Sequence, residues 1–189
     1  GRMLEPLQLV SALEEHFLAE QQLNNIKITI TAGPTREAID PVRGITNLSS
    51  GKMGFAIARA AREAGADVTL VAGPVHLPTP RGVRRVDVKS AQNMLQAVEE
   101  QAQGATVFIA TAAVADWRVA AQSAEKIKKD GSGQPPALHF VENPDILARV
   151  AQSHQAQSGV LYCVGFAAES HDLLAHATAK RARKGVPLL

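Results

Sequence analysis

This chain of 189 residues has one cysteine, few aromatic residues and a small net charge. A lone cysteine, Cys163, cannot form an internal disulfide, so a reducing cytoplasm is the expected setting. It lies in an apolar run, which favours a buried small side chain over a nucleophile. A net charge of +2 gives no general attraction to nucleic acid or to membranes, and no apolar run is long enough to cross a bilayer. We therefore expect neither nucleic acid nor a membrane among the partners.

Several catalytic signatures are missing as well. The six histidines show no metal-ligand spacing and are interpreted as surface or packing residues. The sequence contains no Ser-His-Asp or Cys-His signature of a nucleophilic enzyme. It also has no G-x-G-x-x-G after its first predicted strand and no acidic residue at the end of the second, which argues against an NAD(P)-type oxidoreductase.

What is present is a regular alternation of strand-like and helix-like segments. Apolar runs and period-two alternation predict strands, and alanine-rich amphipathic stretches predict the helices between them. Such alternation indicates βαβ crossovers and a Rossmann-like, doubly wound, mostly parallel α/β sheet. The predicted strands are 26–32, 67–72, 84–88, 106–113 and 160–167, and the predicted helices are 53–64, 91–103, a helix capped by Asn143 with Pro144 in its first turn, and 172–184.

Three segments depart from this alternation. Residues 6–20 form an amphipathic pattern that is typical of a connector helix. Residues 33–50 predict a long irregular loop, and a loop of this length inside a compact domain is usually functional. Residues 137–141 predict a short strand antiparallel to the segment around Ile127, which makes this hairpin a candidate flap or dimer contact. Residues 186–189 resemble the start of a further strand.

A turn rich in serine and glycine precedes the predicted helix 53–64. Backbone N–H groups and hydroxyls at the positive end of a helix dipole suit phosphate. The asparagine of the turn adds an amide that could hold a reacting carbonyl or phosphoryl oxygen. The alternative is an ordinary cap and turn, because asparagine, serine and glycine are common there. The candidate residues are Asn47, Ser49, Ser50 and Gly51.

Charged residues follow the later strands. Asp116 comes after a run of small residues that would let a flat ring or a ribose approach the backbone; alternatively, it accepts hydrogen bonds from nearby loop N–H groups. Basic residues cluster at 126–129 and 180–184. Both clusters suit a triphosphate whose charge is neutralised by lysines and a divalent metal. The alternatives are a solvated face and, for the second cluster, cations at a helix C-terminus.

Seven motifs occur in series along the chain, at residues 32–37, 40–43, 47–54, 112–116, 125–129, 143–146 and 164–169. This series closely resembles the bacterial phosphopantothenate–cysteine ligase domain, usually the C-terminal half of a bifunctional coenzyme A biosynthesis protein. The resemblance covers essentially all of residues 26–185. It implies that residues 1–25 are a connector from an absent flavin-dependent decarboxylase half, the only half to use FMN. Residues 26–189 would be the nucleotide-binding ligase domain, ending before the family's last strand.

The resemblance implies a CTP-dependent ligase. The carboxylate of 4′-phosphopantothenate attacks the α-phosphorus of CTP, giving an acyl-cytidylate and pyrophosphate. The amine of L-cysteine then attacks the acyl carbon and releases CMP. The triphosphate chemistry implies Mg²⁺. Family members dimerise, so we expect a homodimer here and a higher oligomer in the full-length bifunctional protein.

The resemblance also implies roles for individual residues. Ala110, Thr111 and Ala112 would line the nucleotide with their backbone. Asp116 would bind CTP, and Phe166 would pack near it.

Other implied roles concern the reacting groups. Asn47 would hold the acyl-cytidylate, which makes it essential to the second step. Lys126 would contact the nucleotide from the flap, and Lys180 and Lys184 would close over the triphosphate. The residues implied to lie at the phosphates are Pro144, Asp145, Ile146 and Leu147.

Two alternatives remain at this stage. One is the NAD(P)-type oxidoreductase, suggested only by the βαβ pattern. The other is a non-catalytic nucleotide-binding or assembly module, suggested by the connector helix and the early end of the chain.

Overall fold

The computed structural model describes residues 3–18, 21–129, 131–168 and 171–189. A five-stranded sheet in the order β5-β4-β1-β6-β9 forms its centre, and every neighbouring pair in it is parallel. This order confirms the doubly wound fold, because the chain steps outward on one side of β1 and then on the other. The strands are β1 (Lys27–Ala32), β4 (Asp67–Ala72), β5 (Arg84–Asp87), β6 (Val107–Ala110) and β9 (Tyr162–Gly165).

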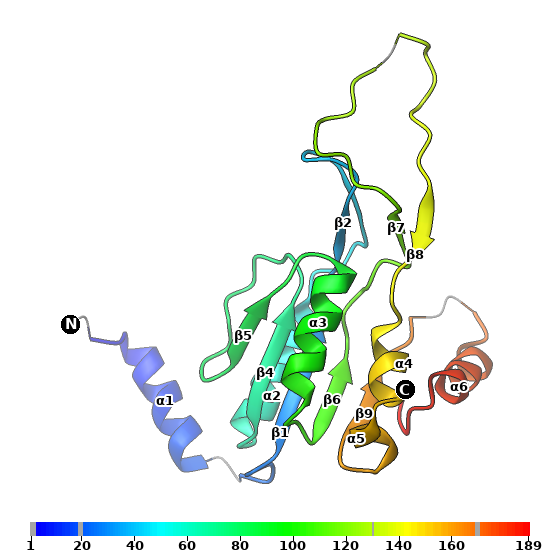
Figure 1. The fold of residues 1–189 in the computed structure, drawn as a ribbon. Helices are drawn as coiled ribbons and strands as arrows, with labels where there is room; N and C mark the ends of the chain where they lie inside the picture. The colour runs from blue at the N-terminus through cyan, green and yellow to red at the C-terminus, as the bar shows by residue number, and fades with distance from the viewer. Residues whose placement is uncertain (1–2, 19–20, 130, 169–170) are drawn as a thin grey trace.

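Helices cover both faces of the sheet (Figure 1). On one face, α2 (Lys52–Glu63) packs on β1 and β4. On the other face lie α3 (Ala91–Ala102) and α4 (Ile146–Ala151). Alternate residues of β1 and β4 therefore enter two separate cores, as period-two geometry requires. The α2 core is centred on Ile30 and Leu70, and the opposite core on Phe108 and Met94.

Glycine allows α2 to lie close to the sheet. A Cβ atom at Gly54 would stand 2.5 Å from both the Cβ of Ala32 and the Oγ1 of Thr111. The helix therefore approaches β1 and the end of β6 more closely than any other residue at position 54 would allow. Gly51, at the N-cap, has a φ of 73°, a left-handed conformation that favours glycine.

Two short antiparallel pairs extend beyond the sheet. The segment 33–50, predicted to be irregular, contains β2 (Arg36–Ala38) paired with β3 (Gly44–Thr46). The predicted partner of the later hairpin strand is wrong: β8 (Phe140–Glu142) pairs with β7 (Trp117–Val119), and not with residues around Ile127. Between them, residues 120–129 and 131–139 form a long excursion, here called the arm, which projects away from the sheet beside β2 (Figure 1).

The start of the helix after β8 also differs from the prediction. Asp145 is the N-cap of α4, with Oδ1 accepting from the N–H of Ala148 at 3.0 Å. Asn143 instead donates through Nδ2 to the carbonyl of Ala115 at 2.8 Å. A short helix, α5 (His154–Gln157), precedes β9, and α6 (Leu173–Lys184) follows it. After α6, Leu188 forms a parallel bridge with Val164, so the predicted further strand begins beside β9.

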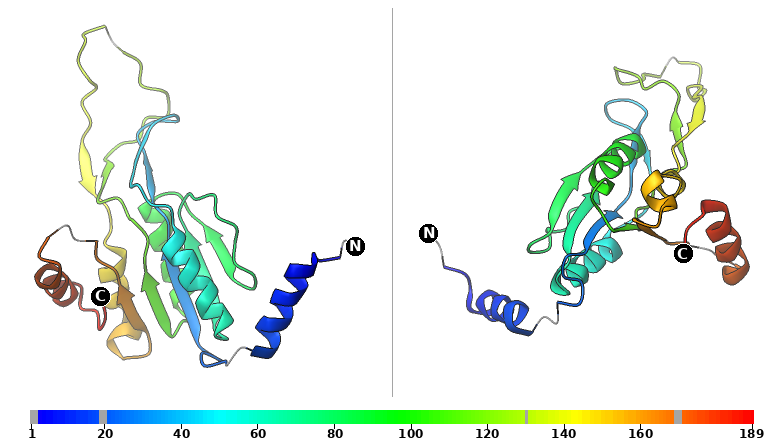
Figure 2. Two further views of the ribbon diagram at one scale, coloured as in Figure 1. Left: turned by 180° about the vertical axis from the view of Figure 1, so that it is seen from behind. Right: turned by 60° about the horizontal axis from the view of Figure 1, so that its bottom comes forward.

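The predicted connector helix is α1 (Pro6–Leu18). Figure 2 shows it at the opposite side of the sheet from α6. Its apolar residues Leu7, Val10 and Leu13 are exposed, so no element of the described chain covers this face. Within the described residues, no helix has both the length and the apolar character that a membrane crossing requires.

Candidate nucleotide site

A cavity of about 480 Å³ lies beyond the carboxyl ends of β6 and β9. It brings together residues that are distant in the sequence, from the segment after β6, the start of α4, the residue after β9 and the last turns of α6. Among the described residues, its lining includes ten of the predicted site residues: Ala110, Ala112, Asp116, Pro144, Asp145, Ile146, Leu147, Phe166, Lys180 and Lys184.

Backbone contacts explain why the cavity lies toward β9. Ligands of doubly wound sheets usually bind where the strand order reverses, here between β1 and β6. In this chain the main chain continues to pair past those strand ends: Ala113 N–H donates to Gly33 at 2.9 Å, and Thr35 N–H donates to Ala113 at 3.2 Å. This backbone pairing fills the space between the ends of β1 and β6, where the strand order reverses. The cavity therefore lies further along the carboxyl edge of the sheet, toward β9.

Asp145 joins two walls of the cavity. One carboxylate oxygen caps α4, and the other pairs with the ammonium of Lys184. An anion is therefore already present at the start of α4. A phosphate placed there would compete with Asp145 for Lys184, so the ion pair is a contact that a triphosphate would have to exchange.

The cationic wall comes from one face of α6. Lys180, Arg183 and Lys184 all line the cavity, and their i, i+3, i+4 spacing puts them on the same side of a helix. Arg183 was not among the predicted site residues. Its helical spacing from Lys180 is the signal that could have found it.

Acidic residues also line this cavity. Asp116 and Glu142 line the same cavity. Glu142 was not among the predicted site residues, since it lies outside the motifs from which they were taken. Its placement follows from the base of the arm, where Asn143 N–H donates to the backbone carbonyl of Asp116 at 2.8 Å and Arg118 donates to the carbonyl of Glu142. The other unpredicted lining residues are Thr31, Val114, Ala115, Trp117 and Asn143.

The predicted phosphate turn lies beside the cavity and not in its lining. Asn47 donates through Nδ2 to the carbonyls of Ala113 at 3.2 Å and Val114 at 3.1 Å. Since Val114 lines the cavity, Asn47 is one residue removed from it. Gly51 N–H donates to the Ser49 hydroxyl, and Lys52 N–H to the Ser50 hydroxyl, both at 3.4 Å. Part of the capping capacity of this turn is thus already used within it.

Two other predicted residues also lie outside the described lining. Thr111 donates to the carbonyl of Thr31 at 2.5 Å and lies under α2 at Gly54, which is a packing position. Lys126 is exposed on the arm.

Sequence reasoning missed an ion pair at the base of the arm, between a buried carboxylate and a partly exposed arginine. The carboxylate of Asp40 is fully buried and accepts from Arg43 at 2.6 Å, from the N–H of Val42 at 2.9 Å and from the N–H of Ile127 at 3.1 Å. Arg43 also donates to the carbonyl of Ile127 at 2.7 Å. The Arg43 guanidinium and the backbone N–H donors hold the pKa of Asp40 well below its usual range, although burial opposes this. These contacts, here called the Asp40–Arg43 tether, connect the β2–β3 turn to the basic segment of the arm.

The single cysteine is buried, as its apolar context predicted. Burial raises the pKa of the Cys163 thiol to about 11, so it stays protonated near neutral pH and has little nucleophilic character.

The fold and the cavity define a Rossmann-like α/β protein with a cavity lined by residues of both charges at the carboxyl edge of its sheet. More specifically, the chain belongs to the family described as the DNA/pantothenate metabolism flavoprotein C-terminal domain, whose model matches residues 23–189. This finding confirms the resemblance inferred from the ordered motifs.

Comparison with named proteins supports the same family assignment. The chain is 51% identical, over its whole length, to the coenzyme A biosynthesis bifunctional protein CoaBC of Vibrio cholerae, of which it covers 46%. It therefore spans about half the length of this relative. A crystal structure of the C-terminal domain of a CoaBC protein superposes with a TM-score of 0.75 at 41% identity, covering 88% of this chain and 76% of the other. A Cab2 mutant in complex with phosphopantothenate-cysteine shares the fold, with a TM-score of 0.68 at 17% identity, over 100% of this chain and 82% of the other.

Proposed function

We propose that this chain is a phosphopantothenate–cysteine ligase domain that uses CTP. The observation that carries the proposal is the cavity beyond β6 and β9, which gathers predicted nucleotide residues from four separate segments. Membership of the pantothenate metabolism family and likeness to CoaBC proteins support the same substrate class. A cytoplasmic location belongs to this proposal and agrees with a single, protonated cysteine.

The first step makes a poor electrophile reactive. A carboxylate oxygen of 4′-phosphopantothenate forms a bond to the α-phosphorus of CTP, and the bond to the pyrophosphate oxygen breaks. Lys180, Arg183 and Lys184 would neutralise the charge that develops on the leaving pyrophosphate. Because these cations share one helix face, they would act together on one triphosphate.

Mg²⁺ fits the carboxylate donors that line the cavity. Carboxylate oxygens are the protein ligands that Mg²⁺ prefers, and it commonly combines one or two of them with phosphate oxygens. Asp116 and Glu142 would hold it, and it would supply charge neutralisation to the phosphates.

The second step forms the amide. The cysteine amine attacks the acyl carbon, the bond to the CMP oxygen breaks, and the amine loses a proton. Asn47 would orient the acyl-cytidylate from its position beside Val114. Lys126 would contact the nucleotide from the basic segment of the arm. FMN has no part in this chemistry and would belong to a decarboxylase region outside these residues.

The direct test is pyrophosphate release. We expect release that requires both CTP and 4′-phosphopantothenate and occurs without cysteine, and amide product only after cysteine is added. ATP in place of CTP tests the choice of nucleotide. Nucleotide binding without pyrophosphate release by the folded protein would support the non-catalytic module instead.

A further inference from the structure

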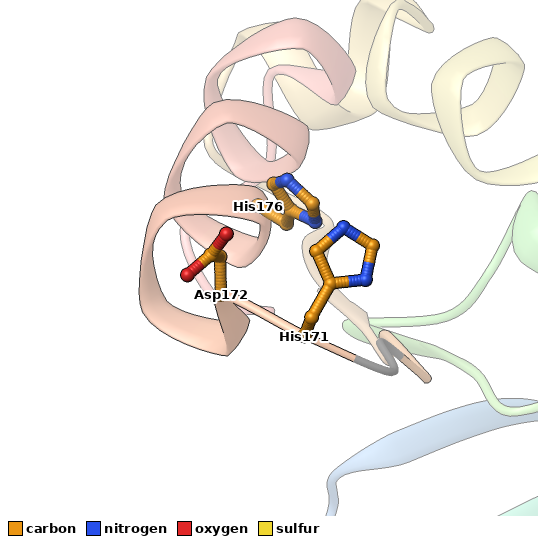
Figure 3. Close-up of side chains that lie close together, drawn as sticks. All are labelled: His171, Asp172 and His176. Carbon is orange, nitrogen blue, oxygen red and sulfur yellow. The ribbon is translucent and has the colours of Figure 1, made fainter.

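Two histidines and an aspartate lie together at the start of α6. The ligand atoms of His171, Asp172 and His176 all lie within 4.8 Å of one another. Figure 3 shows the two imidazole rings side by side, with the carboxylate next to them. Although the spacing of the histidines in the sequence indicated no metal site, the turn into α6 brings them together.

The geometry of the cluster leaves room for a shared ligand. The two rings stand edge to face, with their centroids 4.9 Å apart and their planes at 77°. Asp172 occupies the N-cap position with a left-handed backbone, at φ 46° and ψ 41°. Its side chain makes no capping hydrogen bond to the helix, so this carboxylate is not used as most N-cap carboxylates are.

Two imidazole nitrogens and one carboxylate oxygen form a ligand set suited to a borderline-soft divalent cation. Bond lengths of about 2.0–2.1 Å in a tetrahedral site place ligand atoms about 3.3 Å apart. His171 and Asp172 are exposed, so rotation of their side chains can close the remaining gap. A fourth position would be filled by water.

We propose that His171, Asp172 and His176 form a binding site for Zn²⁺. The site lies outside the lining of the cavity beyond β6 and β9 and does not depend on the proposed ligase activity. By joining residues before and within the first turns of α6, the metal fixes the start of the helix whose later turns carry Lys180 and Lys184.

Titration of the untagged full chain with Co²⁺, in the absence of nucleotide, tests the site directly. Co²⁺ substitutes for Zn²⁺ and reports a low-coordinate site through its visible absorption. We expect saturation at one Co²⁺ per chain and loss of the signal when Zn²⁺ is added. Because even partners outside the metal shell are worth about 10–100-fold in affinity, His171→Ala and His176→Ala should each weaken binding at least tenfold. Asp172→Asn should weaken it as well.

The matched control is His154→Ala, which removes another exposed histidine near a helix start and should leave the titration unchanged. Hydrogen exchange provides a second measurement: Zn²⁺ should slow exchange across residues 173–179 in the parent chain, but not in the His171→Ala/His176→Ala double variant. An equal Co²⁺ affinity in that double variant, or a parent titration without a saturable spectral change, overturns the proposal.

Discussion

Asp40 shows how much can depend on one residue in a loop. It is a buried carboxylate whose hydrogen bonds come from its own turn and from Ile127 on the arm. Removing the charge of this carboxylate weakens the hydrogen bonds that the Arg43 guanidinium and the N–H groups of Val42, Arg43 and Ile127 donate to it. Residues 33–50 therefore contain a structural centre as well as the predicted functional turn.

Asp40→Asn should lower the free energy of unfolding in a way that depends on pH. The folded-state pKa of Asp40 is lowered, so the unfolded chain binds more protons and stability rises with pH. The stabilisation is fully present above the unfolded-state pKa of about 4 and is lost as the pH falls below it. Urea unfolding across a pH series should show the difference between parent and variant shrinking in acid. Glu99→Gln, which breaks an ion pair with Arg149 in which both side chains are exposed, is the control and should have a much smaller effect. A difference that stays constant with pH would contradict the assignment.

Gly54→Ala should destabilise the fold by about 1–3 kcal/mol, the usual effect of overpacking. The added methyl group would meet Ala32 and Thr111 at 2.5 Å, and both belong to or adjoin sheet strands that have little freedom to move. Thermal or urea unfolding measures the change. Gly104→Ala is a matched control, because nothing lies within 4 Å of a Cβ placed there. Equal effects of the two substitutions would show that α2 can shift away from the sheet.

Asn47→Ala should separate the two chemical steps. The amide of Asn47 is held by the carbonyls of Ala113 and Val114 beside the cavity, so its loss should affect the handling of the acyl group more than nucleotide binding. Rapid quench should show pyrophosphate release while acyl-cytidylate accumulates. Asn24→Ala, on the turn before β1, should behave like the parent. Product formation at the parent rate by the Asn47 variant would rule out this role.

At the scale of elements, α6 is the part of the cavity lining in which side chains can be substituted without disturbing the packing of the sheet. No residue of α6 is buried within the described structure, and the ion pair from Lys184 to Asp145 joins its last turn to α4. Substitutions on this helix should therefore affect ligand binding more than folding.

Arg183→Ala and Lys184→Ala should each raise the KM for CTP, by roughly 10- to 150-fold if one charge-assisted hydrogen bond of about 1.5–3 kcal/mol is lost. Steady-state pyrophosphate release at varied CTP concentrations measures this. Arg181→Ala removes a cation of the same helix that does not line the cavity, and it should have little effect. If Arg181→Ala raises the KM as much, the effect comes from general charge and not from the cavity face.

The elements that sequence predicted well are those fixed by local pattern and burial. Strand β4 was predicted over its observed range, and helices α2 and α3 to within a residue or so at each end. The three-residue strands of the β2–β3 and β7–β8 pairs carry too few residues for a periodic signal. Their pairing depends on contacts between distant segments, which explains why β8 was assigned the wrong partner.

At the scale of the whole molecule, the sequence predicted which segments meet at the site. It did not predict all the residues that line the cavity. Parallel strands end at a common edge, so residues after β6 and β9 were expected to meet. The displacement of the cavity away from Asn47 and Ser49 could not be foreseen, because it results from backbone pairing between residues 33–35 and 113. Such backbone pairing cannot be recognised from the pattern of side chains in the sequence.

The arm should also set the oligomeric state. Trp117 and Phe140, at its base, are 53% and 50% exposed, and large apolar groups at such positions suit a partner surface. Phe140→Asp should convert the expected homodimer into monomers, as measured by sedimentation velocity. Val160→Asp changes an equally exposed apolar residue at the α5–β9 turn and should leave the mass unchanged. A parent chain that sediments as a monomer would remove the basis for this prediction.

The Asp40–Arg43 tether has a consequence for how this protein can evolve. It binds the N–H and the carbonyl of Ile127, and not the side chain of that residue. Every amino acid offers that carbonyl, and every one except proline offers that N–H. The basic segment of the arm can therefore exchange its side chains over generations, and with them its preference for one ligand over another, without losing its attachment to the domain. Only Asp40 and Arg43, in a different part of the chain, have to be conserved for this attachment to persist.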